Sequence, residues 1–476
     1  MPPKYILTPE QQAIAEQRRA ERAARKATDA KKDESMKFLR REWLELRTAH
    51  NPIKVLTWNL LAQTLVRRKL FPGSDCLKWT DRKPLLASEM AHHAQCQIIC
   101  LQECDMLPAL LPSLPNHTPI TAAGPGKSHG LVILYNNSIF TQLSSKVIHL
   151  DFENLIDNHP DGNSMETTAL MKRARASSRY TKNIALLAAL SSNTNPKNGV
   201  IVATTHLFWH PKYTYERTRQ ALVLTRAIRK WQSEDGLVHW PVLLAGDLNT
   251  QPSEATYHLL ASPHIPLSLA QRQDLQESLV VHNSVEKIPL IPPCSSTQTT
   301  VPDLSASANS GTSTPGQIKT AEEKEEDHDD KDDKIAANCR SPMLDGSDGL
   351  PTVDRLVKLY QEEFPFQGAM SVYGGTNWIN HGKDVPSFGH RLSKEDEVGD
   401  KEPGYTCFTP LFKLTLDYVF ILPSHPSLSL TRKQVEVDIT KVICPPHPDQ
   451  LGKGLPRKEV CASDHVAVGC ELDIMW

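Results

Sequence analysis

The chain has 476 residues, a formal net charge of −2 and a hydrophobic share of 39%. The near-neutral charge excludes any argument for nucleic-acid binding from whole-chain electrostatics, so a basic surface would have to be local. The ten cysteines show no CxxC pair and no regular spacing. That pattern favours reduced thiols in an intracellular protein over a disulfide framework or a zinc cluster. The low apolar share predicts that part of the chain is not packed.

The sequence shows no clear targeting signal or membrane-spanning segment. No apolar run reaches the length of a membrane span. Lys4 and its polar neighbours argue against a secretory signal, and Glu10, Glu16 and Glu21 argue against a mitochondrial presequence, which avoids acids. We therefore expect an intracellular protein of the cytoplasm, the nucleus or both, with no membrane as a partner.

Residues 1–50 are charged and rich in alanine and other helix formers, with only a thin apolar stripe. This composition predicts a solvated helical or disordered extension. A basic arm that helps hold RNA or directs nuclear entry is the alternative. The folded body is expected to begin sharply near Pro52 and to run to residue 476.

Apolar runs of strand length recur along this body. We expect helices at 79–95 and 214–231, where apolar residues have helical spacing. Many strands with interspersed helices indicate α/β or α+β layering. The expected strands are residues 54–59, 97–103, 130–135, 183–188, 200–205, 242–246, 416–421 and 467–472.

One segment does not fit the body. Residues 292–349 are rich in Ser, Thr and Pro and contain an acidic run at 322–330. Such a composition buries too little apolar surface to offset chain entropy, so it predicts a disordered insertion. The acidic run lacks the turn glycine and the spaced ligands of an EF-hand. An insertion of this kind is also open to binding by other proteins.

Polar residues stand where several expected strands end or begin, which is where a rigid scaffold presents groups to a substrate. Carboxylates suit a hard cation such as Mg²⁺. Asn and His donate to phosphate oxygens, and a His–Asp pair orients or activates water. The mixture therefore fits phosphodiester cleavage. Its members are Asn59, Glu103, His206, Asp247, Asn249, Asp417, Asp464 and His465.

Each of these residues alone also has a plain structural interpretation. Asp247 could build an Asx turn, and Asn59 could cap a helix over residues 60–68. Asp417 is harder to explain in this way, because a buried strand carboxylate needs a partner. The joint pattern, in this order along the chain, favours a catalytic site.

The same series resembles the endonuclease/exonuclease/phosphatase superfamily, from Pro52 to the C-terminus. The resemblance implies a four-layered αββα sandwich, in which two facing mixed β-sheets are covered by helices and the active site lies at one end. The motifs that carry it are Thr57-Trp58-Asn59, Leu101-Gln102-Glu103, Thr205-His206-Leu207, Gly246-Asp247-Leu248-Asn249, Leu416-Asp417-Tyr418 and Ser463-Asp464-His465.

The local context looks like the branch of nocturnin, the angel proteins and the deadenylases. The run from Thr205 to Pro211 resembles its histidine-Trp-Pro loop, and residues 244–253 resemble its Asp-Asn motif with a trailing Pro-Ser. Residues 409–418 look like those of fungal exonucleases that trim ribosomal RNA precursors. The leading expectation is a Mg²⁺-dependent 3′-to-5′ RNA exonuclease, with Mn²⁺ as a substitute ion and single-stranded RNA 3′ ends as substrate.

The resemblance also implies residue roles in metal binding and catalysis. Glu103 would be the principal metal ligand, with Asn59 beside it and Asp464 in the metal shell. Asp247 would align the attacking water, and Asn249 would hold the phosphate. His206 would stabilise the negative charge that develops on the phosphate. His465, oriented by Asp417, would act on the same phosphate or as a base.

Other positions concern the substrate. Pro211 and Phe412 fall where the deadenylases stack the terminal base, and stacking reads little sequence. Cys407 stands where they have an asparagine, which puts strict adenine recognition in doubt. The chain also lacks the leucine-rich N-terminal region by which one deadenylase branch joins a large complex, so that complex is not an expected partner.

Three other functions stay open. A poly(A)-specific deadenylase and a nocturnin-like phosphatase acting on a dinucleotide cofactor would use the same core. A non-catalytic RNA-binding protein with a decayed site is a different class. The complete set of candidate residues argues against decay.

Overall fold

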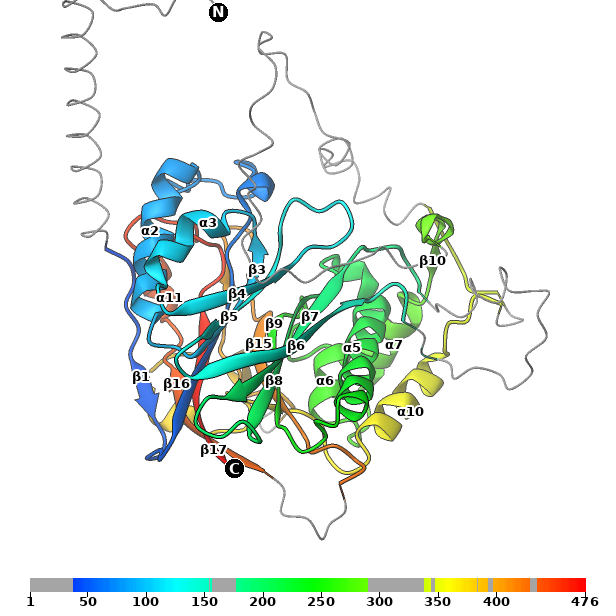
Figure 1. Ribbon diagram of the computed structural model, residues 1–476. Coiled ribbons are helices and arrows are strands. Elements are labelled where there is room, and N and C mark those ends of the chain that lie inside the picture. Colours follow the sequence, from blue (N-terminus) through cyan, green and yellow to red (C-terminus); the bar gives the residue numbers. More distant parts are fainter. Residues whose placement is uncertain are drawn as a thin grey trace, which may run out of the picture.

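The computed structural model of the chain describes residues 37–153, 155, 177–289, 338–343, 347–382, 384–392, 397–428 and 435–476. Two large β-sheets face each other, and helices cover their outer faces (Figure 1). The first sheet has the strand order β1-β16-β17-β2-β3-β5-β4, and only its β2–β3 pair is parallel. Its strands are β1 (Trp43–Glu45), β2 (Pro52–Asn59), β3 (Ile98–Cys104), β4 (His117–Ala122), β5 (Gly130–Asn136), β16 (Glu436–Ile443) and β17 (Val468–Met475).

The second sheet has the order β12-β15-β9-β8-β7-β6. It too contains one parallel pair, β8–β9, near its middle. Each sheet thus carries a central parallel pair between antiparallel neighbours. The strands are β6 (Phe140–His149), β7 (Ile184–Ser192), β8 (Gly199–His206), β9 (Val242–Asp247), β12 (Met370–Ser371) and β15 (Asp417–Leu422).

Three apolar layers hold the sandwich together. Between the sheets, Val55 of the first sheet shares a buried cluster with Val202 of the second. On the outer faces, the first sheet packs on α2 (Trp79–His93) and the second on α5 (Thr214–Glu234). Because both faces of the central strands are covered, these strands consist of nearly continuous apolar residues. The expected four-layered αββα sandwich is confirmed.

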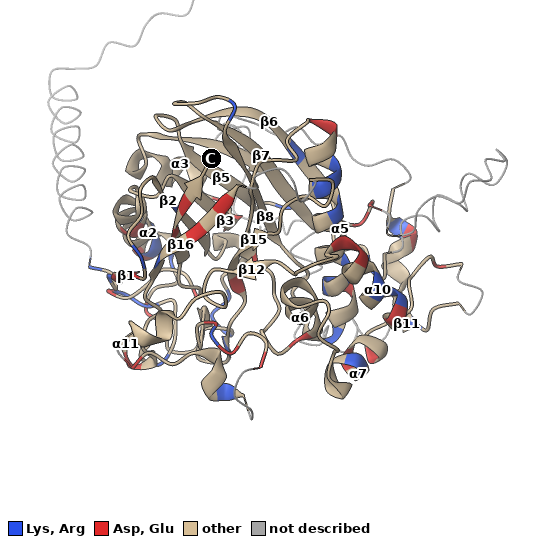
Figure 2. Ribbon diagram, turned by 90° about the horizontal axis from the view of Figure 1, so that it is seen from below, with Lys and Arg blue, Asp and Glu red and all other residues tan. Residues whose placement is uncertain are grey.

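Further helices join α5 on the second sheet, namely α6 (Ala255–Ala261), α7 (Leu269–Glu277) and α10 (Val353–Glu363). Basic and acidic residues are mixed on α5, α7 and α10 (Figure 2). Ion pairs such as that of Arg229 with Glu363 connect α5 to α10. The charge of this outer layer is therefore locally balanced.

All eight predicted strands and both predicted helices are present, and no end is shifted by more than four residues. The helix proposed for residues 60–68 is wrong, because only a 3₁₀ turn at Gln63–Leu65 forms there. Of the strands in the two large sheets, the prediction omitted β1, β4, β6, β12 and β16. On β6, part of one face is exposed, so polar residues interrupt the apolar run that marks a buried strand.

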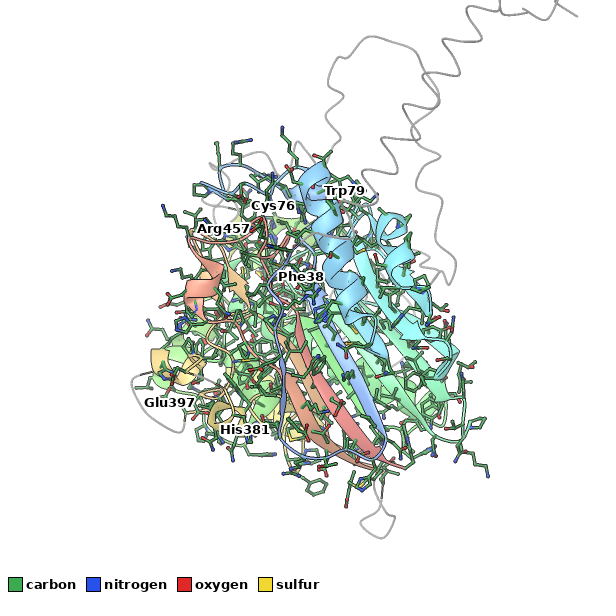
Figure 3. All side chains as sticks on the ribbon, turned by 90° about the vertical axis from the view of Figure 1, so that its left-hand side faces the viewer. Phe38, Cys76, Trp79, His381, Glu397 and Arg457 are labelled. Atoms are coloured by element: carbon green, nitrogen blue, oxygen red, sulfur yellow. The ribbon has the colours of Figure 1, made fainter. Side chains whose placement is uncertain are left out.

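The folded body begins earlier than predicted. Trp43–Glu45 forms β1 and pairs with β16. Phe38 is buried beside α2, with its ring 5.4 Å from that of His92 (Figure 3). The boundary expected at residue 50 is therefore too late, because a few apolar side chains in a charged segment anchor it to the first sheet. The rest of the predicted extension, residues 1–36, lies outside the described residues.

The predicted insertion also has a corrected boundary. β11 (Cys339–Arg340) pairs with β10 (Val281–His282), and Arg340 forms an ion pair with Asp348 at 2.6 Å. The C-terminal limit expected at residue 349 is thus too late. Residues 290–337, which contain most of the predicted insertion, lie outside the described residues.

Excising residues 290–337 and joining the ends with a short Gly-Ser linker should leave the melting temperature nearly unchanged. The reason is that the flanking strands are already held together, with the Asn283 N–H donating to the Asn338 carbonyl at 3.0 Å. Differential scanning calorimetry of the intact and excised proteins measures the effect. Loss of the cooperative transition on excision would show that the segment belongs to the core.

Candidate active site

The candidate residues meet at one edge of the sandwich because of strand direction. The parallel strands β2, β3, β8 and β9 all carry polar residues at their carboxyl ends, including Asn59, Glu103 and His206. His206 lies opposite Asp247 in the β8–β9 register. Asp417, the first residue of antiparallel β15, lies opposite the same aspartate on its other side. Residues far apart in sequence are thereby brought side by side.

The Asn59 side chain joins the two sheets at this edge. Its Nδ2 donates to Glu103 Oε1 at 3.3 Å and to Asp247 Oδ2 at 2.9 Å. Its Oδ1 accepts the Leu61 N–H at 3.0 Å, and the Ala62 N–H donates to Glu103 Oε2 at 3.0 Å. Asn59 therefore spaces two carboxylates that would otherwise repel each other.

Glu103 has a strained backbone. Its φ is +52°, a left-handed value that non-glycine residues rarely adopt. The register of β3 against β5 shifts between Leu101 and Cys104 around it. Such strain clusters at functional sites. Here the left-handed residue leaves the regular strand just where its carboxylate meets Asn59.

The His206 ring lies between the same two carboxylates. Its Nδ1 is 3.9 Å from Glu103 Oε1, and its Nε2 is 3.6 Å from Asp247 Oδ2. Burial alone would raise the pKa of Glu103, but the facing His206 and His129 lower it. Burial and the neighbouring Asp417 raise the pKa of Asp247. The two carboxyls thus differ in proton affinity, which suits an ionised ligand and a proton acceptor.

A buried Asp–His pair lies beside Asp247. His465 Nδ1 is 2.7 Å from Asp417 Oδ2, and His465 Nε2 is 3.8 Å from Asp247 Oδ2. Burial by itself would lower the pKa of His465, but Asp417 and other neighbours raise it well above its ordinary value. The imidazole is thus held in the protonated form. The partner that the buried Asp417 was expected to need is His465.

The turn after β9 positions two further groups. The Asn249 N–H donates to Asp247 Oδ1 at 2.9 Å, which is the Asx turn considered above. Asn249 has a φ of +48°, and its Nδ2 donates to the Leu207 carbonyl at 2.9 Å. The Asx turn and the contact with Asn59 are therefore compatible, because the turn fixes one Asp247 oxygen and leaves the other facing Asn59.

Asp464 precedes His465 and is half-buried. Burial raises the pKa of its carboxyl to about 6, and Glu103 adds to that rise. Its backbone carbonyl accepts the Phe408 N–H at 2.9 Å. Because burial penalises its charged form, this carboxyl would be stabilised by a nearby cation, which favours the ionised form.

The predicted substrate residues lie in two loops. Pro211 is exposed and begins a 3₁₀ turn at Pro211–Tyr213. Phe412 is 51% exposed at the tip of the hairpin formed by β13 (Cys407–Phe408) and β14 (Lys413–Leu414). Cys407 is buried, and its sulfur lies within 4.8 Å of ligand atoms of Asp464 and His465. Cys407 is therefore beside the Asp–His pair, whereas Phe412 is open to solvent.

Three residues that contact the site or interact with it electrostatically were not identified from the sequence. His129 precedes β5 and acts electrostatically on Glu103 and His206. Gln102 donates from Nε2 to Thr204 Oγ1 at 3.0 Å and so links the two sheets one step below the site. A usable signal existed for His129. Because β5 runs antiparallel to β3, the start of β5 lies at the edge where β3 ends.

The third missed residue is Arg82, fully buried on α2. Its Nε donates to the Ala462 carbonyl at 2.8 Å, and its Nη2 donates to the Leu60 and Leu61 carbonyls at 2.5 Å. It thereby holds the loop after β2 against the loop that carries Asp464. Nothing in the helical spacing of α2 distinguishes this arginine from a solvated one.

The donor set fits a hard divalent cation. The ligands on offer are all oxygens, namely the carboxylates of Glu103 and Asp464 and the side-chain carbonyl of Asn59. Mg²⁺ prefers oxygen ligands and is usually held by one or two carboxylates and several waters. Among the described residues, two groups of three have ligand atoms within 4.8 Å of one another: Cys407–Asp464–His465 and Asp247–Asp417–His465. Neither group contains Glu103.

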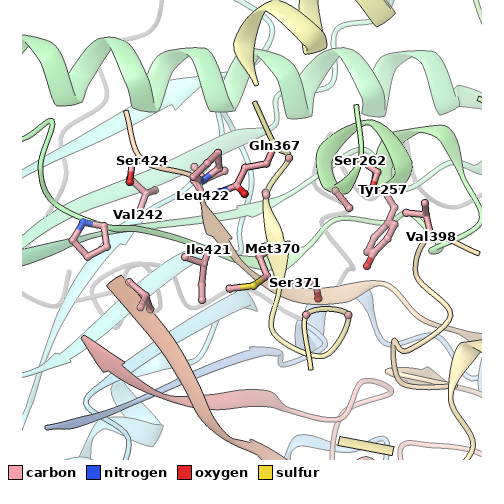
Figure 4. Close-up of a pocket in the computed structure, with 18 of the residues that line it drawn as sticks. Val242, Tyr257, Ser262, Gln367, Met370, Ser371, Val398, Ile421, Leu422 and Ser424 are labelled. Atoms are coloured by element: carbon pink, nitrogen blue, oxygen red, sulfur yellow. The ribbon is translucent and has the colours of Figure 1, made fainter. Parts of the chain in front are cut away.

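A sizeable cavity among the described residues lies away from these side chains. It measures about 650 Å³ and is lined by Val242, Leu422 and Met370 among others (Figure 4). Val242 begins β9 and Leu422 ends β15, so the cavity is at the opposite end of the strands that carry Asp247 and Asp417.

No helix in the described residues has the length and apolar character to cross a membrane.

A profile of the Endonuclease/Exonuclease/phosphatase family matches residues 56–305. The chain belongs to this family. The match begins in β2, includes Asn59, Glu103, His206 and Asp247, and ends before Asp417 and His465. The predicted membership is confirmed, and with it a nuclease or phosphodiesterase as the class of enzyme.

Relatives within this family are similar over different shares of the chain. A probable RNA exonuclease of Schizosaccharomyces pombe is 26% identical over 502 residues, covering 100% of this chain and 89% of that protein. RNA exonuclease NGL2 of Saccharomyces cerevisiae is 31% identical over 286 residues, 54% of each protein. Human 2′,5′-phosphodiesterase 12 is 29% identical over 224 residues, 45% of this chain and 36% of that one.

Among solved structures of the family, ANGEL2, described as a 2′,3′-cyclic phosphatase, covers 91% of this chain and 98% of its own. Its sequence identity is 17% and the TM-score is 0.49.

Proposed function

We propose that the protein is a Mg²⁺-dependent 3′-to-5′ RNA exonuclease that releases 5′-nucleotides, with trimming of ribosomal RNA precursors as its favoured role. The observation that carries the proposal is the group of hydrogen-bonded polar side chains at one edge of the sandwich. Asn59 spaces Glu103 from Asp247, and the Asp417–His465 pair lies against the same aspartate. The relatives named as RNA exonucleases support RNA as the substrate.

In the proposed mechanism Glu103 is the principal ligand of the cation, with Asn59 and Asp464 beside it. A bound Mg²⁺ would neutralise charge on the scissile phosphate as that charge develops. Asn59 holds Glu103 Oε1 in place, and the Ala62 N–H holds Oε2. Both hydrogen bonds favour the ionised carboxyl, which is the form that binds a cation.

Asp247 is proposed to align the attacking water and accept its proton. Its raised pKa makes it a stronger base than an exposed aspartate. Of the two roles left open by the sequence, His465 is proposed to donate to the phosphate instead of acting as the base, and its raised pKa and its contact with Asp417 support that choice. His206 would donate to the same phosphate, and Asn249 would hold it.

The deciding experiment uses a 5′-labelled single-stranded RNA with purified protein and Mg²⁺. A ladder shortening from the 3′ end, with release of 5′-nucleotides, is expected. A second arm offers a 2′-phosphorylated dinucleotide and a third a 2′,5′-linked oligonucleotide, both at equal concentration. Faster hydrolysis in either arm than of RNA would overturn the proposed substrate, and no hydrolysis in any arm would favour a non-catalytic protein.

Replacing Phe412 with alanine should weaken RNA binding by about 1–3 kcal/mol, the value of one base–aromatic stack. The ring is half-exposed at the hairpin tip and is free to meet a base. Fluorescence anisotropy with labelled RNA at fixed salt, under Ca²⁺ in place of Mg²⁺, measures the change. Phe366→Ala, which removes an 80%-exposed ring elsewhere, is the matched control. Equal losses in both variants would contradict the stacking role.

A further inference from the structure

We propose that Cys407, Asp464 and His465 form a second metal site that takes Zn²⁺ and that its occupation inhibits hydrolysis. The inhibition rests on the proposed function, whereas the binding does not. The three ligand atoms lie within 4.8 Å of one another. A thiol, an imidazole and a carboxylate make a mixed S, N and O donor set, which Zn²⁺ accepts in tetrahedral geometry.

The backbone places the sulfur beside the imidazole. Cys407 and His465 are partners in an antiparallel bridge, flanked by hydrogen bonds from the Phe408 N–H to the Asp464 carbonyl at 2.9 Å and from the Val466 N–H to the Thr406 carbonyl at 2.8 Å. Directly opposed residues of an antiparallel pair have Cβ atoms about 4.5–5.5 Å apart on one face. Backbone pairing, and not side-chain placement alone, therefore holds the two residues side by side.

Asp417 already supplies the outer partner that a metal-binding histidine needs. It holds His465 Nδ1 at 2.7 Å, which leaves Nε2 as the nitrogen for an ion. Ligating histidines almost always have their other ring nitrogen bonded to a carboxylate, carbonyl or water, which orients the ring. The same contact that serves catalysis thus also prepares His465 as a ligand.

The thiol separates this site from the Mg²⁺ site in ion preference. Mg²⁺ selects oxygen ligands, while a thiolate favours Zn²⁺ and softer ions. Burial raises the pKa of Cys407 to about 11, so binding must displace the thiol proton, and it must displace the Nε2 proton of His465 as well. Both protons leave to solvent, and affinity therefore increases with pH.

Occupation would remove His465 from the phosphate. A Zn²⁺ ion on Nε2 takes the position from which the protonated imidazole would donate to the substrate. It also engages Asp464, which is proposed for the Mg²⁺ shell. Inhibition is thus expected even when Mg²⁺ is saturating.

The test uses the full chain and two ions. Co²⁺ added to the protein should give the near-ultraviolet absorption of a thiolate–Co²⁺ bond, and Zn²⁺ should displace it. Cys407→Ser should lose this absorption and bind Zn²⁺ at least tenfold more weakly in a chelator competition. Cys444→Ser removes a half-buried thiol outside both ligand groups and should keep both properties.

Three outcomes would overturn the inference. They are a Co²⁺ complex of the wild-type protein with no thiolate absorption, an unchanged Zn²⁺ affinity in Cys407→Ser, and full RNA hydrolysis with the site loaded. The first needs no variant, so it decides the case even if Cys407→Ser fails to fold. A protein that binds Co²⁺ through its thiol but hydrolyses no RNA would reject the proposed function and leave the metal site standing.

Discussion

Replacing Glu103 with glutamine is expected to reduce RNA hydrolysis to below a few per cent of wild type while leaving the fold intact. The amide keeps the volume of the side chain and can still accept the Ala62 N–H bond. It removes the negative charge on which the proposed cation binding depends. Because Asn59 Nδ2 is shared with Asp247, that aspartate retains its hydrogen bond in the variant.

The measurement is single-turnover hydrolysis across a Mg²⁺ titration, with RNA binding followed separately. Glu277→Gln, an exposed carboxylate on α7, is the matched control and should retain wild-type turnover. RNA binding and the melting temperature should change little in either variant. Turnover of Glu103→Gln above a few per cent at saturating Mg²⁺ would show that the metal ligand has been wrongly assigned.

Asp417→Asn is expected to lower turnover by about 10²- to 10³-fold, within the range for loss of a positioned acid or base. A neutral amide does not stabilise the protonated form of His465. If the amide side chain of the variant flips, its NH₂ group faces Nδ1 in place of an oxygen. The ring would then lose both its charge and its orientation. Asp473→Asn is the matched control, since it breaks another Asp–His contact, with His50 at 3.1 Å, at the opposite end of β2.

The pH profile separates this effect from simple damage. In the wild type, Asp417 and its neighbours raise the pKa of His465 well above its ordinary value, so the activity should persist as pH rises past neutrality. In Asp417→Asn the alkaline loss of activity should move to lower pH. An equal reduction of activity at every pH, with no shift of the alkaline side of the profile, would contradict the role given to the Asp417–His465 pair.

The same contact has a consequence for stability. A group whose folded pKa lies above its unfolded pKa, about 6.5 for histidine, stabilises the fold fully below that pH. The contribution is lost as pH rises through the folded pKa. The free energy of unfolding of the wild type should therefore decline above neutral pH by more than that of Asp417→Asn, which urea titrations at several pH values would measure.

Much of the fold was predictable because burial leaves a direct mark on sequence. Strands covered on both faces, such as β9, consist of consecutive apolar residues, and the polar residues at their ends stand out against them. The half-exposed β6 carries no such mark. β1 is too short to be recognised, and its residues were assigned to a charged extension although Leu44 and Phe38 anchor them.

By itself the sequence determined the family, the sandwich and the identity of the strand-end residues, because these depend on local apolar runs and on motif order. Only the tertiary structure decided which of those residues lie in contact. The Asn59–Asp247 contact spans 188 positions, and it depends on the packing of one sheet on the other. The roles of Arg82 and His129 have the same origin. Their chemistry comes from the carboxylates and carbonyls that the fold brings to them, and no local pattern encodes such neighbours.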